Sequence, residues 1–214
     1  MRVNKGLMIA ATFDPTKRTS LITVADMCRK IEENSISLPL YQRDISWTLQ
    51  KCIDLLNYQL WGKAPVSPIS INVINTVDSA VPQVSFIDRE IISTIERGQY
   101  SVVDGQQRLT TNYKAYCNHD DFRNIVLDLG KGEFTEVRDS IRSNQIPVGI
   151  LLNKEDTKLF EYTKAKSALG SADVLSVLLQ VRSKMRNYNY TLNSAEDLTE
   201  DEQIEWFEVL NNAG

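Results

Sequence analysis

Residues 101–111 read Ser-Val-Val-Asp-Gly-Gln-Gln-Arg-Leu-Thr-Thr. Val102 and Val103 are β-branched, which favours a strand, and Gly105 permits a tight turn of the backbone. Leu109 is then followed at helical spacing by Tyr113 and Tyr116. The pattern therefore predicts a junction at which a strand turns directly into a helix.

Such a junction is suited to binding an anion. The first amides of a helix have no partner inside the helix and carry a partial positive charge, so they favour a phosphate group. Arg108 could bring a planar, permanently charged guanidinium to the same phosphate. Asp104 could cap the helix, bind magnesium or act as a base for water, and the sequence leaves these roles open. In the simplest structural alternative, Asp104 only caps and Arg108 only pairs with it.

Three motifs resemble those of one protein family. Residues 104–111 resemble the signature of the N-terminal domain family of the GmrS/GmrD type IV restriction systems, itself similar to the ParB/sulfiredoxin fold. Upstream, Tyr41-Gln42-Arg43 followed by Trp47 is similar to a second motif of that family. Residues 207–214, Phe-Glu-Val-Leu-Asn-Asn-Ala-Gly, are similar to a third. The motifs occur in the expected order, and the resemblance covers about residues 20–214.

The resemblance implies an α+β fold with a small mixed sheet, flanking helices and a helical C-terminal part. The patterns of apolar residues agree, because they read as mixed α/β up to about residue 150 and as helical beyond it. We expect an N-terminal extension over residues 1–20, a ParB-like α/β nucleotide-binding domain over 21–150 and a helical appendage over 151–214. The appendage stops where relatives typically continue, so it is either a natural minimal form or a fragment.

Local patterns place individual elements. Helices are expected after the caps Thr23, Thr48 and Thr199, the last with Glu202 three residues on as a capping box. Strands are expected where apolar and polar residues alternate or where turn residues flank an apolar run. They lie at 36–38 and 69–73, in a hairpin of 125–129 with 134–137, and in a second hairpin of 91–95 with 100–103.

Composition narrows the range of functions that the chain could have. The net charge of -4 argues against broad, charge-driven binding of nucleic acid. The three cysteines are widely spaced, which is typical of a reduced, cytoplasmic protein, and no apolar run is long enough to cross a membrane. The single histidine, His119, makes a zinc site or a histidine-based nuclease centre hard to assemble. A local basic face for DNA remains open at Lys164, Lys166, Arg182, Lys184 and Arg186.

The resemblance implies a domain that binds and hydrolyses a nucleoside triphosphate, with magnesium, and that is linked to restriction of modified phage DNA through a partner nuclease. Oligomers are compatible with this reading. The main alternative is a non-catalytic ParB-like switch or scaffold that binds nucleotide or DNA. We assign catalysis to Asp104, Gln107 and Arg108, and magnesium to Asp104. We expect nucleotide or phosphate contacts from Gln42, Arg43, Gly105, Gln106, Arg108 and Thr111.

Overall fold

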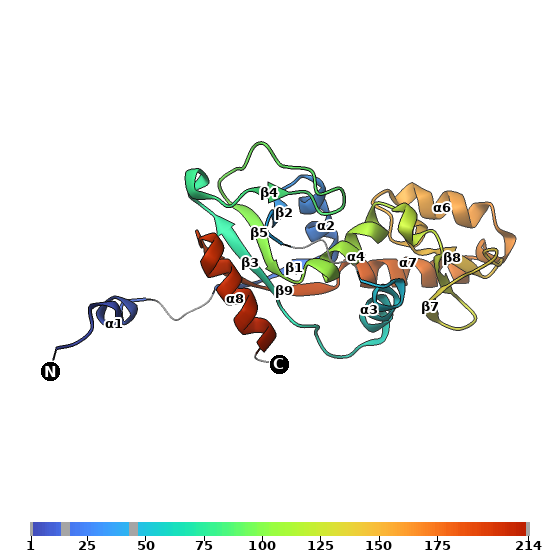
Figure 1. Cartoon of the computed structure of the whole chain (residues 1–214). Coiled ribbons are helices and arrows are strands. Elements are labelled where there is room, and N and C mark those ends of the chain that lie inside the picture. Colours follow the sequence, from blue (N-terminus) through green and yellow to red (C-terminus); the bar gives the residue numbers. More distant parts are fainter. Residues whose placement is uncertain (1, 14–17, 43–46, 213–214) are drawn as a thin grey trace.

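The computed structural model describes residues 2–13, 18–42 and 47–212 of the chain. They form a mixed α+β fold with two sheets (Figure 1). The larger sheet has the strand order β1-β9-β3-β5-β2-β4. Its strands are β1 (Arg18–Thr23), β2 (Ile36–Pro39), β3 (Ile69–Ile74), β4 (Gln83–Val84), β5 (Gln99–Asp104) and β9 (Asn189–Glu196).

The smaller sheet and its helices form the other end of the body (Figure 1). Its strand order is β7-β6-β8, with β6 (Ile125–Asp128), β7 (Glu133–Glu136) and β8 (Gln145–Pro147). Asp128 organises the turn after β6, since its carboxylate accepts hydrogen bonds from the amides of Gly130 and Lys131 and from the side chain of Gln145. The expected hairpin of 125–129 with 134–137 is confirmed.

Eleven helical segments occur in the described part of the chain. The longer ones are α1 (Lys5–Ala10), α2 (Val24–Glu32), α3 (Leu49–Trp61), α4 (Gln106–Tyr116), α6 (Asp156–Lys164), α7 (Ala172–Arg186) and α8 (Glu200–Asn212). A short helix, α5, spans Val148–Leu151, and there are 3-10 turns at Val77–Ser79, Asp120–Phe122 and Ser167–Leu169. The caps at Thr23 and Thr48 are confirmed, and Thr199 and Glu202 form the expected capping box.

Helix α4 lies between two hydrophobic cores. Leu109 and Tyr116 pack into the core of the larger sheet, whereas Ala115 packs into the core of the helical end. Along β5, successive side chains point to opposite faces. Val102 joins the core beneath α2, and Val103 lines a cavity together with residues of α8. Strand β5 and α4 therefore carry the motif through the middle of the molecule.

The C-terminal part is largely helical, as expected, but it also supplies a strand that the sequence analysis did not predict. Strand β9 lies between β1 and β3, antiparallel to the first and parallel to the second. The larger sheet therefore takes strands from both sides of residue 150. Only Tyr190 and Leu192 are buried in β9, so its alternation is too short to distinguish it from a loop.

The second expected hairpin, 91–95 with 100–103, is not formed. Ile91 makes one bridge to Val84, and β5 pairs instead with β3 and β2. The turn at Gly98 does lead into β5 as expected, with a φ of +88°. Pairing with β3 and β2 gives β5 hydrogen-bonded neighbours on both edges, whereas a hairpin of two strands would leave one edge unpaired.

Tyr190 fixes α4 to the sheet. Its hydroxyl accepts hydrogen bonds from Gln59 Nε2 and Asn112 Nδ2, each at 2.9 Å, and burial raises its pKa well above the usual range. Tyr190→Phe should lower the free energy of unfolding by about 2 to 4 kcal/mol, because Gln59 loses a buried acceptor and Asn112 keeps only the carbonyl oxygen of Arg108. Urea unfolding measures this loss. Tyr58→Phe, which removes an exposed hydroxyl, should change it by less than about 0.5 kcal/mol, and equal losses would contradict the assignment.

Candidate functional site

The strand-to-helix junction is present where the sequence predicts it. Strand β5 ends at Asp104, Gly105 adopts φ +103°, and α4 begins at Gln106. A Cβ atom on Gly105 would overlap Ile69 Cδ1, so the position needs glycine for space as well as for its backbone conformation. The pairing of β3 with β5 shifts register between Ser70 and Ile71, directly beside Asp104. Asp104 makes no capping hydrogen bond, because Gly105 occupies the N-cap position.

Arg108 is held by the chain itself. Its guanidinium donates hydrogen bonds to the carbonyl oxygens of Ser67 and Pro68, the latter at 3.2 Å. It also pairs with Asp104 Oδ2 at 3.1 Å, and the two side chains are 12% and 32% exposed. The ion pair expected in the simplest structural alternative is therefore present. Both residues nevertheless line a cavity, so the pair is accessible to a ligand.

This cavity has a volume of about 710 Å³ and lies between the start of α4 and helix α8. A volume of this size can hold a ligand as large as a nucleotide. The cavity is lined by a mixture of aromatic, amide and charged side chains. They are Tyr41, Gln42, Trp47, Asp104, Gly105, Gln106, Gln107, Arg108, Phe207, Glu208 and Asn211, with Val103 and Ile204.

Gln42 lines the cavity and is tied to strand β5. Its Nε2 atom donates to the carbonyl oxygen of Val103 at 3.2 Å. Its Oε1 atom is buried and has no hydrogen-bond partner among the described residues. The side-chain hydrogen bond of Gln42 thus goes to the end of β5, and the expected contact of Gln42 with a ligand stays a prediction.

The other expected site residues fall into three groups. Gln106 and Gln107 line the cavity, and Gln107 Oε1 also accepts from the amide of Trp47 at 3.0 Å. Thr111 lies outside the cavity lining, since its hydroxyl is buried against the carbonyl oxygen of Gln107 and the sulfur of Cys52. Arg43 lies outside the described residues, so its expected role stays a prediction.

A wider groove of about 900 Å³ adjoins the cavity. The two hollows share Trp47, Asp104, Arg108 and Asn211, so the Asp104–Arg108 pair lies where they meet. Across the groove lie Tyr58 and the turn from Pro65 to Pro68, whose carbonyl oxygens hold Arg108. A ligand in either hollow could reach the same carboxylate and guanidinium.

The sequence analysis assigned no role to α8, although this helix forms one wall of the cavity. Phe207, Glu208 and Asn211 lie in the third family motif, so the signal was present in the sequence. The side chain of Gln203 anchors the helix by accepting from the Tyr41 hydroxyl at 3.2 Å. Burial, with a smaller contribution from Glu200, raises the pKa of Tyr41 to about 12, so this hydroxyl remains a neutral donor.

Magnesium would need oxygen atoms from a bound ligand to complete its coordination shell at this site. Asp104 offers one carboxylate, and no cluster of three or more His, Cys, Asp or Glu side chains suited to a metal occurs in the described part of the chain. Magnesium commonly takes one or two carboxylates and completes its shell with phosphate oxygens and water. Asp104 could therefore hold the ion when a polyphosphate is bound.

The expected basic face for DNA is largely taken up by internal contacts. Arg182 is buried and donates to the carbonyl oxygens of Leu151 and Asn153. Arg186 pairs with Asp156, and Lys184 donates to the carbonyl oxygen of Leu60. Lys164 and Lys166 are exposed or half-exposed on the surface. Three of the five cations thus stabilise the helical end instead of forming a shared free surface.

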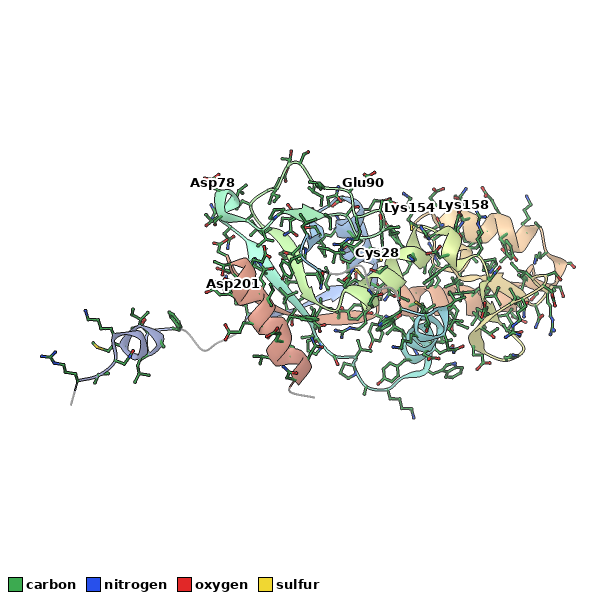
Figure 2. All side chains as sticks on the ribbon, in the orientation of Figure 1. Cys28, Asp78, Glu90, Lys154, Lys158 and Asp201 are labelled. Carbon is green, nitrogen blue, oxygen red and sulfur yellow. The ribbon has the colours of Figure 1, made fainter. Side chains whose placement is uncertain are left out.

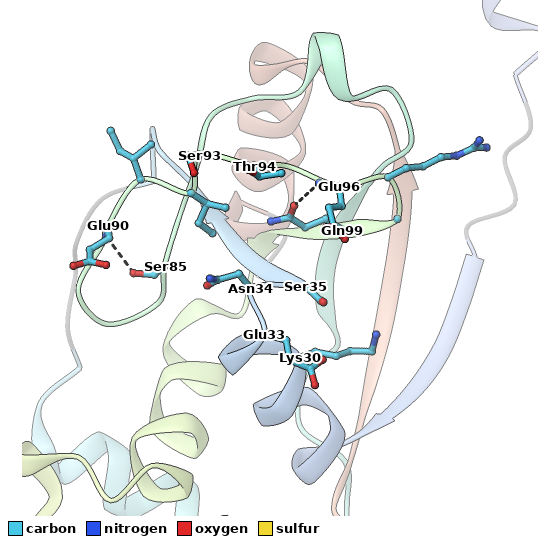
Figure 3. A pocket seen from close by; sticks show the side chains of 14 residues that line it. Lys30, Glu33, Asn34, Ser35, Ser85, Glu90, Ser93, Thr94, Glu96 and Gln99 are labelled. Atoms are coloured by element: carbon cyan, nitrogen blue, oxygen red, sulfur yellow. Dashed lines mark hydrogen bonds between the residues drawn. The ribbon is translucent and has the colours of Figure 1, made fainter.

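A separate cavity of about 460 Å³ lies away from the motif, between the end of α2 and the loop before β5 (Figure 3). Some of its polar groups are paired with each other, for example the Glu90 amide with Ser85 Oγ and the Glu96 amide with Gln99 Oε1. None of the expected site residues lines it. The hollow beside Asp104 is therefore the candidate site.

The fold and the site define a mixed α+β domain in which a glycine turn opens the start of a central helix to a cavity. The sequence model described as GmrSD restriction endonuclease, N-terminal domain, matches residues 24–214, so the chain belongs to this family. A search of curated proteins found no match. Membership makes the chain a module of a restriction system. The partners that this family implies are DNA and a nuclease.

In the part of the chain that the structure describes, every helix is too short or too polar to span a bilayer.

Proposed function

We propose that the chain is the nucleoside-triphosphate-binding and hydrolysing module of its restriction system. The observation that carries the proposal is that α4 begins at the wall of a cavity with Asp104, Gly105, Gln106 and Arg108 around it. A helix N-terminus in a cavity is suited to phosphate, and a carboxylate beside it can hold magnesium.

The phosphates would lie against the first amides of α4 and the outer edge of Arg108. Because carbonyl oxygens of the turn from Ser67 to Pro68 hold the guanidinium in place, Arg108 is already oriented before a ligand enters. Such preorganised charge stabilises a phosphoryl-transfer transition state without reorganisation during the reaction. Gln106 and Gln107, at the same wall, would orient the attacking water or contact phosphate.

The nucleoside would lie toward α8. Tyr41 and Phe207 offer aromatic surface there, and Gln42 lines the same cavity. Magnesium, when bound, would neutralise phosphate charge, while Asp104 would hold it or orient water.

A non-catalytic switch is the second candidate, and one observation favours it. Arg108 donates hydrogen bonds to Ser67, Pro68 and Asp104, so its main role could be to stabilise the strand-to-helix junction. In that reading the cavity binds nucleotide without turnover, and binding alone signals to the partner nuclease. The two candidates use the same residues and differ in whether phosphate is released.

Phosphate release distinguishes them. The intact chain should release phosphate from at least one of ATP, GTP, CTP and UTP with magnesium, and chelating the metal should stop it. Calorimetric titration with a non-hydrolysable analogue measures binding in parallel. Binding without release of phosphate would identify the switch. The absence of both binding and release would refute both candidates.

A further inference from the structure

The loop after β4 is closed on itself by hydrogen bonds. The amide of Ser85 donates to the carbonyl oxygen of Glu90 at 2.9 Å, and the amide of Glu90 donates to Ser85 Oγ at 3.1 Å. Ile91 then makes the bridge to Val84. Glu90 marks this loop in Figure 2, and Figure 3 shows its hydrogen bond with Ser85. Arg89 therefore lies in a loop whose shape is set by its neighbours.

Arg89 has an unusual backbone conformation for its residue type. Its φ is +54°, in the left-handed region. The other described residues with a positive φ, apart from glycine, are Asn34, Asn118 and Asp197. Asn and Asp adopt this conformation readily, whereas an arginine in it is strained. Such a conformation persists only where surrounding contacts hold it, so the contacts of the Arg89 side chain have to compensate for the strain.

The side chain of Arg89 holds a neighbouring piece of main chain. Its Nη2 atom donates to the carbonyl oxygen of Gln42 at 2.6 Å and to that of Leu40 at 3.3 Å. Hydrogen bonds from a charged donor are stronger than those between neutral groups. The guanidinium thereby joins the loop after β4 to residues 40–42, which directly follow β2.

This piece of main chain belongs to the wall of the candidate site. Tyr41 and Gln42 line the cavity, whereas Arg89 does not. The Tyr41 hydroxyl donates to Gln203 of α8, and Gln42 Nε2 donates to the carbonyl oxygen of Val103 in β5. The segment that Arg89 holds is thus bonded to both the helix and the strand that border the cavity.

We propose that Arg89 is a positioning residue for the candidate site. By holding the carbonyl oxygens of Leu40 and Gln42, it fixes Tyr41 and Gln42 in the cavity wall before a ligand enters. This role rests on the proposed function, in which the ligand is a nucleoside triphosphate. Arg89 lies outside the three family motifs and acts on the ligand only through the main chain that it holds.

Two substitutions separate the contacts of the side chain from the strain of the backbone. Arg89→Gly relieves the strain but removes both hydrogen bonds, so it should weaken binding of a non-hydrolysable triphosphate analogue about tenfold. Arg89→Lys keeps the strain, the charge and donors for the two carbonyl oxygens, so its affinity should stay within about threefold of that of the unmodified chain. A purely structural role of the loop predicts the reverse order, because glycine suits the left-handed conformation better.

Hydrogen exchange tests the contact without a ligand. The amide of Leu40 donates to the carbonyl oxygen of Pro82 at 2.8 Å, and the amide of Gln42 donates to that of Pro39 at 3.0 Å. In Arg89→Gly both amides should exchange at least about tenfold faster, because the segment opens locally more often.

Arg97→Gly is the matched control. It removes the same charge from an exposed residue of the loop before β5, outside the cavity, so it should change neither exchange nor affinity. Urea unfolding checks that each variant is folded. Unchanged exchange in Arg89→Gly, unchanged affinity despite faster exchange, or weaker binding by Arg89→Lys than by Arg89→Gly would overturn the proposal. If the unmodified chain binds no analogue of ATP, GTP, CTP or UTP, the proposed function fails instead, and the exchange rates still decide whether Arg89 holds residues 40–42.

Discussion

Replacing Asp104 by asparagine should lower nucleotide hydrolysis at least about 100-fold and leave the fold intact. The change removes the negative charge that would hold magnesium or orient water, and such groups contribute on the order of 100-fold or more. The asparagine oxygen can still accept the hydrogen bond from Arg108, so the free energy of unfolding should fall by less than about 1 kcal/mol. Phosphate release and urea unfolding measure the two quantities.

Asp54→Asn is the matched control for this experiment. Asp54 lines the adjoining groove and accepts a hydrogen bond from Gln50, but it does not line the cavity beside α4. Its variant should hydrolyse within about twofold of the unmodified rate, because no transition-state contact is lost. Full activity in Asp104→Asn would remove Asp104 from the mechanism.

Gly105→Ala should lower the free energy of unfolding by about 2 to 5 kcal/mol. A left-handed conformation costs an alanine about 1 to 2 kcal/mol, and the overlap with Ile69 Cδ1 adds about 1 to 3 kcal/mol. Nucleotide binding should fall as well, because the turn that exposes the first amides of α4 would shift. Urea unfolding and an analogue titration measure these effects.

Two further variants separate the cost of the left-handed backbone conformation from the cost of the overlap with Ile69. Gly98→Ala has a similar φ, +88°, with no atom within 4 Å of the new Cβ, so it should cost only about 1 to 2 kcal/mol. Combining Gly105→Ala with Ile69→Val removes Cδ1 and should recover part of the overlap term in a double-mutant cycle. Equal losses of unfolding free energy for Gly98→Ala and Gly105→Ala would show that overlap with Ile69 adds no cost at Gly105.

The sequence predicted the central junction because its signals are local. The β-branched run, the glycine and the helical spacing of Leu109 and Tyr116 lie within sixteen residues, and each acts on its immediate neighbours. The caps at Thr23 and Thr48 were predictable for the same reason. The cavity also contains most of the expected residues, since Asp104, Gly105, Gln106, Gln107 and Arg108 all line it.

What the sequence did not reveal depends on distant contacts. The carbonyl oxygens that hold Arg108 are not visible in a pattern of side chains, because every residue carries the same backbone carbonyl. Thr111 sits one helical turn beyond Gln107, so its hydroxyl bonds back to that carbonyl instead of reaching the cavity. Strand β9 joins the sheet through partners more than a hundred residues away.

The position of β9 has a consequence for synthesis of the protein on the ribosome. Until residues 189–196 have emerged, β1 and β3 lack the strand that joins them, and Tyr190 cannot yet anchor α4. Pairing across such a long sequence separation is slow, and unpaired strand edges invite aggregation meanwhile. The nascent chain thus completes its candidate site among the last steps of folding, and a product terminated before residue 189 would lack both β9 and the α8 wall of the cavity.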